Sequence, residues 1–318
     1  MPHIKCTCRS LWDLNEIIAS SVFYQTRPPS PPVPLPCVPG PKLAPFTRTA
    51  YADDIEFIQF LGRENDVDSL VWKVKINKAG PFVLKVFYFW HWDFLRRNQG
   101  GDLTRRLASP QLYVDYFDPF NCECRAYGRL KQEKREDLAV RALGYLLFNP
   151  QQEIDLAQKV EGRSTPPPSA NATTMDGDFW GWQEQHRGLP VRAIVKDLVA
   201  SKAPDPAQDA GLWLDLQALH SLGIFVKDTH GGNYLNGKLV DFSRSWTMYH
   251  PALDQIDAYT LRSLMLDELQ HLLDYYCDGA NDSTAYNWLK WETNADAAKA
   301  YVEQELFERT PGAAVDVL

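Results

Sequence analysis

The stretch between residues 55 and 89 most constrains the fold, because three short apolar runs follow one another closely within it. Each run is rich in β-branched and aromatic residues. The runs are IEFIQFLG (55–62), SLVWKVKI (69–76) and PFVLKVFYF (81–89). Runs of this length and composition are typical of strands, and the NKAG sequence between the last two suits a hairpin connection. The sequence therefore predicts three successive antiparallel strands.

Two further strands are predicted at 141–148 and 189–199, after which the pattern becomes helical. Helical spacing of apolar residues is found at 119–135, 209–224 and 253–308. The run YLNGKLVDF (234–242) contains Asn-Gly between two apolar pieces, which predicts a hairpin. A β-rich half followed by an α-rich half indicates an α+β protein with two lobes, an antiparallel β-sheet N-lobe and a helical C-lobe.

Proline-rich segments suggest where the domains begin and end. Residues 28–45 (PPSPPVPLPCVPGPKLAP) favour an extended conformation, and we interpret them as a linker within an N-terminal segment, 1–50. A docking site for a partner that binds PxxP motifs is the alternative. The N-lobe is predicted at 51–199, with a surface insertion at 149–188, and the C-lobe at 200–318.

Composition excludes several classes of function. The 318 residues carry a net charge of −8, so no strongly basic face is expected, and we predict that the protein does not bind nucleic acid. No apolar stretch has the length of a membrane span or a signal peptide. Six cysteines in a chain of this length do not predict a disulfide scaffold. We therefore expect an intracellular protein, cytoplasmic or nuclear, without membrane association.

The segment LHSLGIFVKDTHGGNYLNGKLVDFS (219–243) contains the most informative polar residues. Asp228 and Asn233 lie five residues apart on a predicted loop, and Asp241 ends the predicted hairpin. Because the hairpin returns Asp241 to the loop, two carboxylates and an amide oxygen can converge there. Such oxygen ligands suit Mg²⁺. Asp228, nearer the opening, could accept a proton from an incoming hydroxyl group.

A lysine upstream completes a possible constellation. Lys85 lies within the apolar strand FVLKVF, where an ammonium group is costly unless it has a partner. Glu123, on the predicted helix that follows, is the natural candidate. A Lys–Glu pair facing two aspartates and an asparagine is what phosphoryl transfer requires.

These residues, in this order, resemble the eukaryotic protein-kinase-like superfamily over residues 51–273. The DTHGGN sequence is also similar to the D-x-H-x-x-N loop of aminoglycoside and choline phosphotransferases. More narrowly, FVLKVF, ECRAYGRL and the LHSLGI…DFS block resemble a fungal family of kinase-fold proteins grouped with a kinetochore subunit of the Sim-type complex.

The superfamily resemblance implies ATP and Mg²⁺ as cofactors. Lys85 would contact the α- and β-phosphates, Glu123 would hold Lys85, and Asp228 would be the catalytic base. Asn233 and Asp241 would be the metal ligands. The other residues implied to contact the nucleotide are Gly62, the gatekeeper Val195 and the hinge residues Lys196, Asp197 and Leu198.

Several features depart from the kinase pattern. The loop that should cover the phosphates keeps only Gly62 and carries Glu64, Asp66 and Asp68, whose charges repel a triphosphate. The usual His-Arg before the base is Val226-Lys227, and Ser243 replaces the glycine after Asp-Phe. Only RSWTMYHP (244–251) follows, which is short for docking a peptide substrate.

Two main hypotheses follow. The first is a phosphotransferase that transfers the γ-phosphoryl group of ATP to a hydroxyl acceptor with Asp228 as its base; a small-molecule phosphotransferase, suggested by DTHGGN, is a third and separate hypothesis. The second is a kinase-fold scaffold, weak or inactive in catalysis, within a protein complex such as the fungal kinetochore. The aromatic run FYFWHWDF (87–94) predicts either a strand packed under the lobe or a surface that docks a protein partner.

Overall fold

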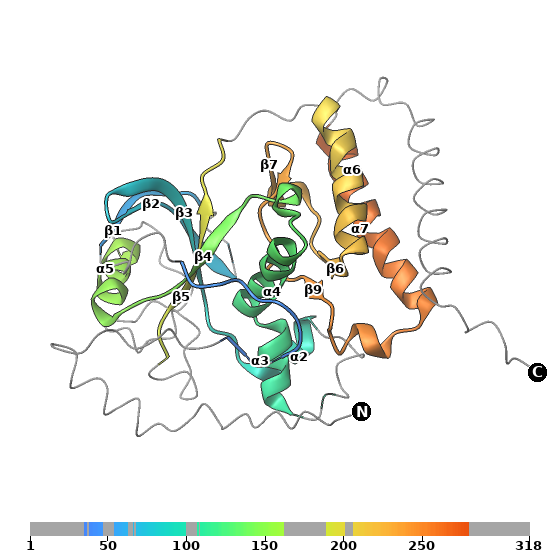
Figure 1. Cartoon of the computed structure of the whole chain (residues 1–318), viewed down its shortest axis with the longest axis horizontal. Helices are drawn as coiled ribbons and strands as arrows, with labels where there is room; N and C mark the ends of the chain where they lie inside the picture. The colour runs from blue at the N-terminus through green and yellow to red at the C-terminus, as the bar shows by residue number, and fades with distance from the viewer. Residues whose placement is uncertain are drawn as a thin grey trace, which may run out of the picture.

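The computed structural model describes residues 35–36, 38–46, 54–62, 66, 68–99, 107, 109–161, 189–200 and 206–279. Its β-rich part is a five-stranded antiparallel sheet in the order β1-β2-β3-β5-β4 (Figure 1). The strands are β1 (Ile55–Phe60), β2 (Ser69–Ile76), β3 (Ala79–Phe87), β4 (Ala142–Leu147) and β5 (Arg192–Asp197). All five coincide with predicted runs.

Helices and very short strands make up the remainder, so the mixed α+β class is confirmed. The helices are α2 (Trp92–Gln99), α3 (Pro110–Phe117), α4 (Pro119–Gln132), α5 (Pro150–Glu161), α6 (Pro206–Ser221) and α7 (Ala258–Gly279). The short strands are β6 (Ile224–Phe225), β7 (Tyr234–Leu235), β8 (Lys238–Leu239) and β9 (Trp246–Thr247). The predicted Asn236-Gly237 hairpin is confirmed: both residues have positive φ, and β7 pairs with β8 across them. No helix among the described residues is long and apolar enough to cross a membrane.

Helix α4 begins where its sequence predicts a helix start. The side chain of Asp118 accepts hydrogen bonds from the backbone N–H groups of Phe120 and Asn121, and Pro119 takes the first helical position. Both carboxylate oxygens of Asp118 also pair with Arg192 of β5, at 3.0 and 3.1 Å. The start of α4 is therefore tied to the sheet.

The alternation of side chains along β3 determines which residues face α4. Leu84 and Val86 join one apolar cluster with the residues of the outer face of the sheet. Phe87 joins a second cluster with Phe120 of α4 and with residues of α6 and α7. Since side chains two residues apart share a face, Lys85 points toward α4, which Figure 1 shows between the sheet and the α6–α7 pair.

Helix α5 corrects the expectation for part of the predicted insertion. Its residues Leu156 and Val160 are buried in the same cluster as Leu84, so residues 150–161 pack against the sheet and do not loop away from it. The prediction was wrong here because the prolines and glycines of the insertion lie mainly beyond this helix. Residues 162–188 lie outside the described part.

A partly buried hydrogen bond joins α5 to the segment before β5. The Glu153 Oε1 accepts the backbone N–H of Val191 at 2.8 Å, just before β5. We expect Glu153→Ala to lower the free energy of unfolding by about 1–3 kcal/mol, because the buried Val191 N–H loses its acceptor. Urea denaturation measures the effect. Gln151→Ala on the same helix is the control, since that side chain makes an exposed hydrogen bond to Asp155. Equal stability of the two variants would contradict this role for Glu153.

The described part of the proline-rich region, residues 35–36 and 38–46, lies against the rest of the fold. We call it the strap. Leu43 N–H donates to the Cys124 carbonyl at 2.8 Å, and Phe46 N–H donates to the Tyr145 carbonyl at 2.9 Å. Val38, Leu43 and Phe46 are each buried, one in each of the three apolar clusters. The interpretation of these residues as a spacer was wrong, because their apolar side chains reach the core. Residues 28–34 lie outside the described part.

Two glycines allow the strap to approach. A Cβ on Gly128 of α4 would lie 2.5 Å from the backbone N and C atoms of Lys42. A Cβ on Gly144 of β4 would lie 2.5 Å from the backbone N of Phe46. Backbone therefore packs directly on backbone at both crossings.

Two arginines join α4 to another segment of the chain. The Arg125 Nη2 donates to the backbone carbonyls of Thr247 and Tyr249, at 2.7 and 2.5 Å. The Arg129 Nη2 donates to the Met248 carbonyl at 2.9 Å. The segment that follows Asp241 is thus held against α4.

The aromatic run at 87–94 is divided between core and surface. Phe87 and Phe89 are buried, in agreement with the prediction of a strand packed under the lobe. The strand ends at Phe87, however, and Phe94 lies on α2 with 41% of its surface exposed, stacked on Trp90.

Candidate functional site

The candidate site is built around Lys85, whose residue surface is only 3% exposed. Its Nζ atom lies 2.8 Å from the Glu123 Oε2 atom and 2.5 Å from the Asp241 Oδ1 atom. Burial alone would lower the pKa of Lys85, but the two carboxylates outweigh burial and raise it. The predicted Lys85–Glu123 pair and its contact with Asp241 are therefore present.

A second lysine, Lys196, enters the same cluster. Its Nζ atom donates to the Glu123 Oε1 atom and, at 2.6 Å, to the Val240 carbonyl. The prediction of a hinge residue at this position was wrong, because of the register between β3 and β5. Lys85 pairs with Ile194, so Lys196, two residues on, shares its face of the sheet.

Val195 cannot be the predicted gatekeeper for the same reason. It pairs with Leu84 and is fully buried in the cluster on the other face of the sheet. The signal that could have revealed this was the alternation in RAIVKD, read against FVLKVF with the correct register.

Lys85, Lys196, Glu123 and Asp241 form what we call the ion cluster, with two cations and two anions. Burial raises the pKa of Asp241, but the positive charges of Lys85 and Lys196 lower it by more than burial raises it. The Ser243 N–H also donates a hydrogen bond to Asp241 at 2.7 Å, which lowers the pKa as well. The net result is a pKa well below the usual range for a carboxyl group. The cluster is thus neutral overall, with each charge compensated by a neighbour.

The predicted catalytic loop is joined to the ion cluster through the backbone of Val240, which donates to the Asn233 carbonyl and accepts from Lys196. The Asn233 Nδ2 donates to the Asp228 backbone carbonyl at 2.9 Å, so the two predicted residues are in contact. The Asp228 side chain is 37% exposed and lies 3.6 Å from His230 Nε2 and 4.0 Å from Arg244 Nε. No direct contact joins Asp228 to Lys85 among those that the structure describes.

Glu268 of α7 supports this loop and was not predicted. It accepts the backbone N–H groups of Val226 and Lys227, each at 3.0 Å, and pairs with His220 at 2.9 Å. A glutamate in a long amphipathic helix carries no local signal of such a role, because its partners lie about 40 residues earlier in the chain.

The connection between β1 and β2 places the carboxylate of Asp68 near the site. Asp68 Oδ2 lies 3.4 Å from the Ser243 Oγ atom and 3.3 Å from the Arg244 Nε atom. Gly62, the one glycine retained in the predicted phosphate loop, donates its N–H to the Val71 carbonyl on the neighbouring strand. A Cβ there would meet the ring of Phe60. Gly62 therefore serves the turn after β1.

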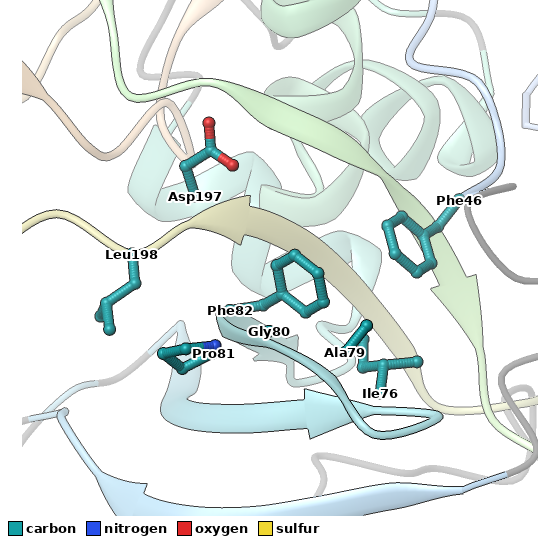
Figure 2. A pocket seen from close by; sticks show the side chains of 8 residues that line it. All are labelled: Phe46, Ile76, Ala79, Gly80, Pro81, Phe82, Asp197 and Leu198. Carbon is teal, nitrogen blue, oxygen red and sulfur yellow. The ribbon is translucent and has the colours of Figure 1, made fainter.

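The remaining hinge residues, Asp197 and Leu198, line a cavity of about 510 Å³ at the β2–β3 turn (Figure 2). Phe46 and Phe82 also line it, and both belong to the apolar cluster on the sheet face opposite Lys85. None of the ion-cluster residues lines this cavity. The predicted nucleotide residues therefore do not converge on one place.

These positions do not fit a bound Mg²⁺–polyphosphate. The Asp68 carboxylate lies on Arg244, where it would repel a phosphate. Within the described ranges, no group of three or more His, Cys, Asp or Glu side chains gathers in a way that could hold a metal ion.

A protein-family model matches this chain. The family described as "Kinetochore Sim4 complex subunit FTA2" matches residues 31–246, more than half of the chain. The chain belongs to this family. The predicted relationship to a kinetochore subunit family is therefore confirmed. The matched range includes the strap, the sheet, α4 and all four residues of the ion cluster. No curated protein matches the chain.

Proposed function

We propose that this chain is a scaffold subunit of a kinetochore Sim4-type complex, and that it acts in the nucleus without phosphotransferase activity. Membership of the FTA2 family supports the assembly role. The observation that carries the absence of catalysis is Asp68, whose carboxylate lies on Arg244 and Ser243, where it would repel a triphosphate.

We further propose that the fold is related to that of protein kinases. The five-stranded antiparallel sheet followed by helices supports this relationship. So do the Lys85–Glu123 pair, Asp241 after a hairpin and the contact of Asn233 with the Asp228 loop, in the order that the resemblance implies. In this view, the residues that form a catalytic centre in protein kinases stabilise the folded state of this chain.

A phosphotransferase is the second candidate, favoured by the exposure of the Asp228 carboxylate on an ordered loop. An assay of ATP turnover with Mg²⁺ separates the two. We expect the wild-type protein to release phosphate no faster than Asp228→Asn, because the Asp68 carboxylate would repel the triphosphate. If Asp228→Asn were slower by roughly 10²–10⁴-fold, as the loss of a general base would produce, the scaffold proposal would be wrong.

A cellular experiment tests the assembly role itself. In cells whose own copy is replaced, Asp228→Asn should localise to kinetochores and support chromosome segregation at wild-type protein levels. Glu123→Gln, which disrupts the ion cluster, should reduce both through loss of folded protein. Failure of Asp228→Asn at normal abundance would contradict the proposal, and so would absence of the wild-type protein from kinetochores.

A further inference from the structure

Asp68 is held in place by the sheet and directed toward the ion cluster. Its backbone carbonyl accepts the N–H of Tyr88 at 3.1 Å, immediately before β2 begins at Ser69. Its side chain is only 14% exposed and contacts Ser243 and Arg244, which directly follow the Asp241-Phe242 pair. A side chain from the β1–β2 connection thus bridges the sheet and the segment after the hairpin.

The Asp68 carboxylate lies against groups that can bind an anion. Burial outweighs the positive charges of Arg244 and Lys85, so the pKa of Asp68 is raised, and the charge of Asp241 acts with burial. The Arg244 guanidinium and the Ser243 hydroxyl supply the hydrogen-bond donors. Donors of these two types also bind phosphate groups.

We propose that Arg244 and Ser243, near Lys85, form an anion-binding site that Asp68 occupies from within the chain, and that this occupation excludes phosphorylated ligands. The inference rests on the proposed function, since it explains why the residues of a kinase-like centre bind no nucleotide. Asp68 replaces the ligand with a fixed carboxylate. Removing that carboxylate should leave a cationic site open to a polyphosphate.

Calorimetric titration with Mg·ATP and, separately, with inorganic tripolyphosphate tests this inference on the full chain. We expect no binding to the wild-type protein at millimolar ligand and measurable binding to Asp68→Ala, tighter by roughly tenfold or more because a buried repulsive charge has been removed. Asp68→Asn, which keeps the shape, should also bind. Asp68→Ala/Arg244→Ala should lose the gained affinity. Binding of Mg·ATP alone indicates a nucleotide site, and binding of both ligands indicates a general phosphate site; each supports the proposal.

Asp137→Asn is the matched control, because Asp137 pairs with Arg135 on the surface and its loss changes the net charge equally. Gained binding in this control would overturn the proposal. So would equal affinity of wild type and Asp68→Ala, or no binding to either Asp68 variant when thermal unfolding shows both to be folded. These results are distinguishable from failure of the scaffold proposal, which depends on Asp228-dependent turnover and on kinetochore localisation of the wild-type protein.

Discussion

Glu123→Gln is expected to lower the free energy of unfolding by about 3–5 kcal/mol, the range for removing one partner from a buried ion pair. Glu123 is fully buried and accepts from both Lys85 and Lys196. The neutral amide leaves Asp241 as the only carboxylate for two buried ammonium groups. Urea denaturation of the full chain, followed by circular dichroism, measures the change.

Two variants separate charge from packing in this experiment. Glu133→Gln, at the exposed end of the same helix, should change stability by less than about 0.5 kcal/mol. The double variant Lys196→Met/Glu123→Gln should recover part of the lost free energy of unfolding, because a single cation, Lys85, then remains opposite Asp241. A loss below about 1 kcal/mol for Glu123→Gln, or no recovery in the double variant, would contradict the ion cluster as described.

Gly128→Ala is expected to destabilise the protein by about 3–5 kcal/mol, although alanine normally favours a helix over glycine by about 1 kcal/mol. The added Cβ would collide with the Lys42 backbone, which cannot yield as a flexible side chain can. The strap would have to leave α4, exposing Leu43 and Phe46. Trypsin cleavage after Lys42 should therefore become faster in this variant.

Gly211→Ala in α6 is the matched control. An added Cβ at Gly211 has no neighbour within 4 Å among the residues that are described. This variant should gain about 0.5–1 kcal/mol from helix propensity. If both alanine variants were stabilised alike, the strap could not lie against α4 as the structure has it.

The ion cluster was only partly predictable from the sequence. Lys85 was identifiable because a lone lysine in an apolar strand needs a partner, and Asp241 because it follows an Asn-Gly hairpin. Lys196 was misassigned, since its role depends on how β5 registers against β3. These strands are more than 100 residues apart, and nothing local specifies that register.

The strap illustrates a different limit of sequence reasoning. Proline content correctly indicates an extended conformation, but it does not indicate whether an extended segment is solvated or packed. The decisive partners are Gly128 and Gly144, and a single sequence does not connect them to residues 35–46. The strands and helices themselves were easier to predict from the sequence, because apolar periodicity is a local property.

The attachments of α4 have a consequence for the dynamics of the molecule. One helix is joined to β5 through Asp118, to the strap at Gly128, to the charged centre through Glu123 and to the chain beyond β9 through Arg125. Its amide protons can exchange with solvent only when several of these attachments open together. The slowest-exchanging part of the protein is therefore expected to be its most polar buried region.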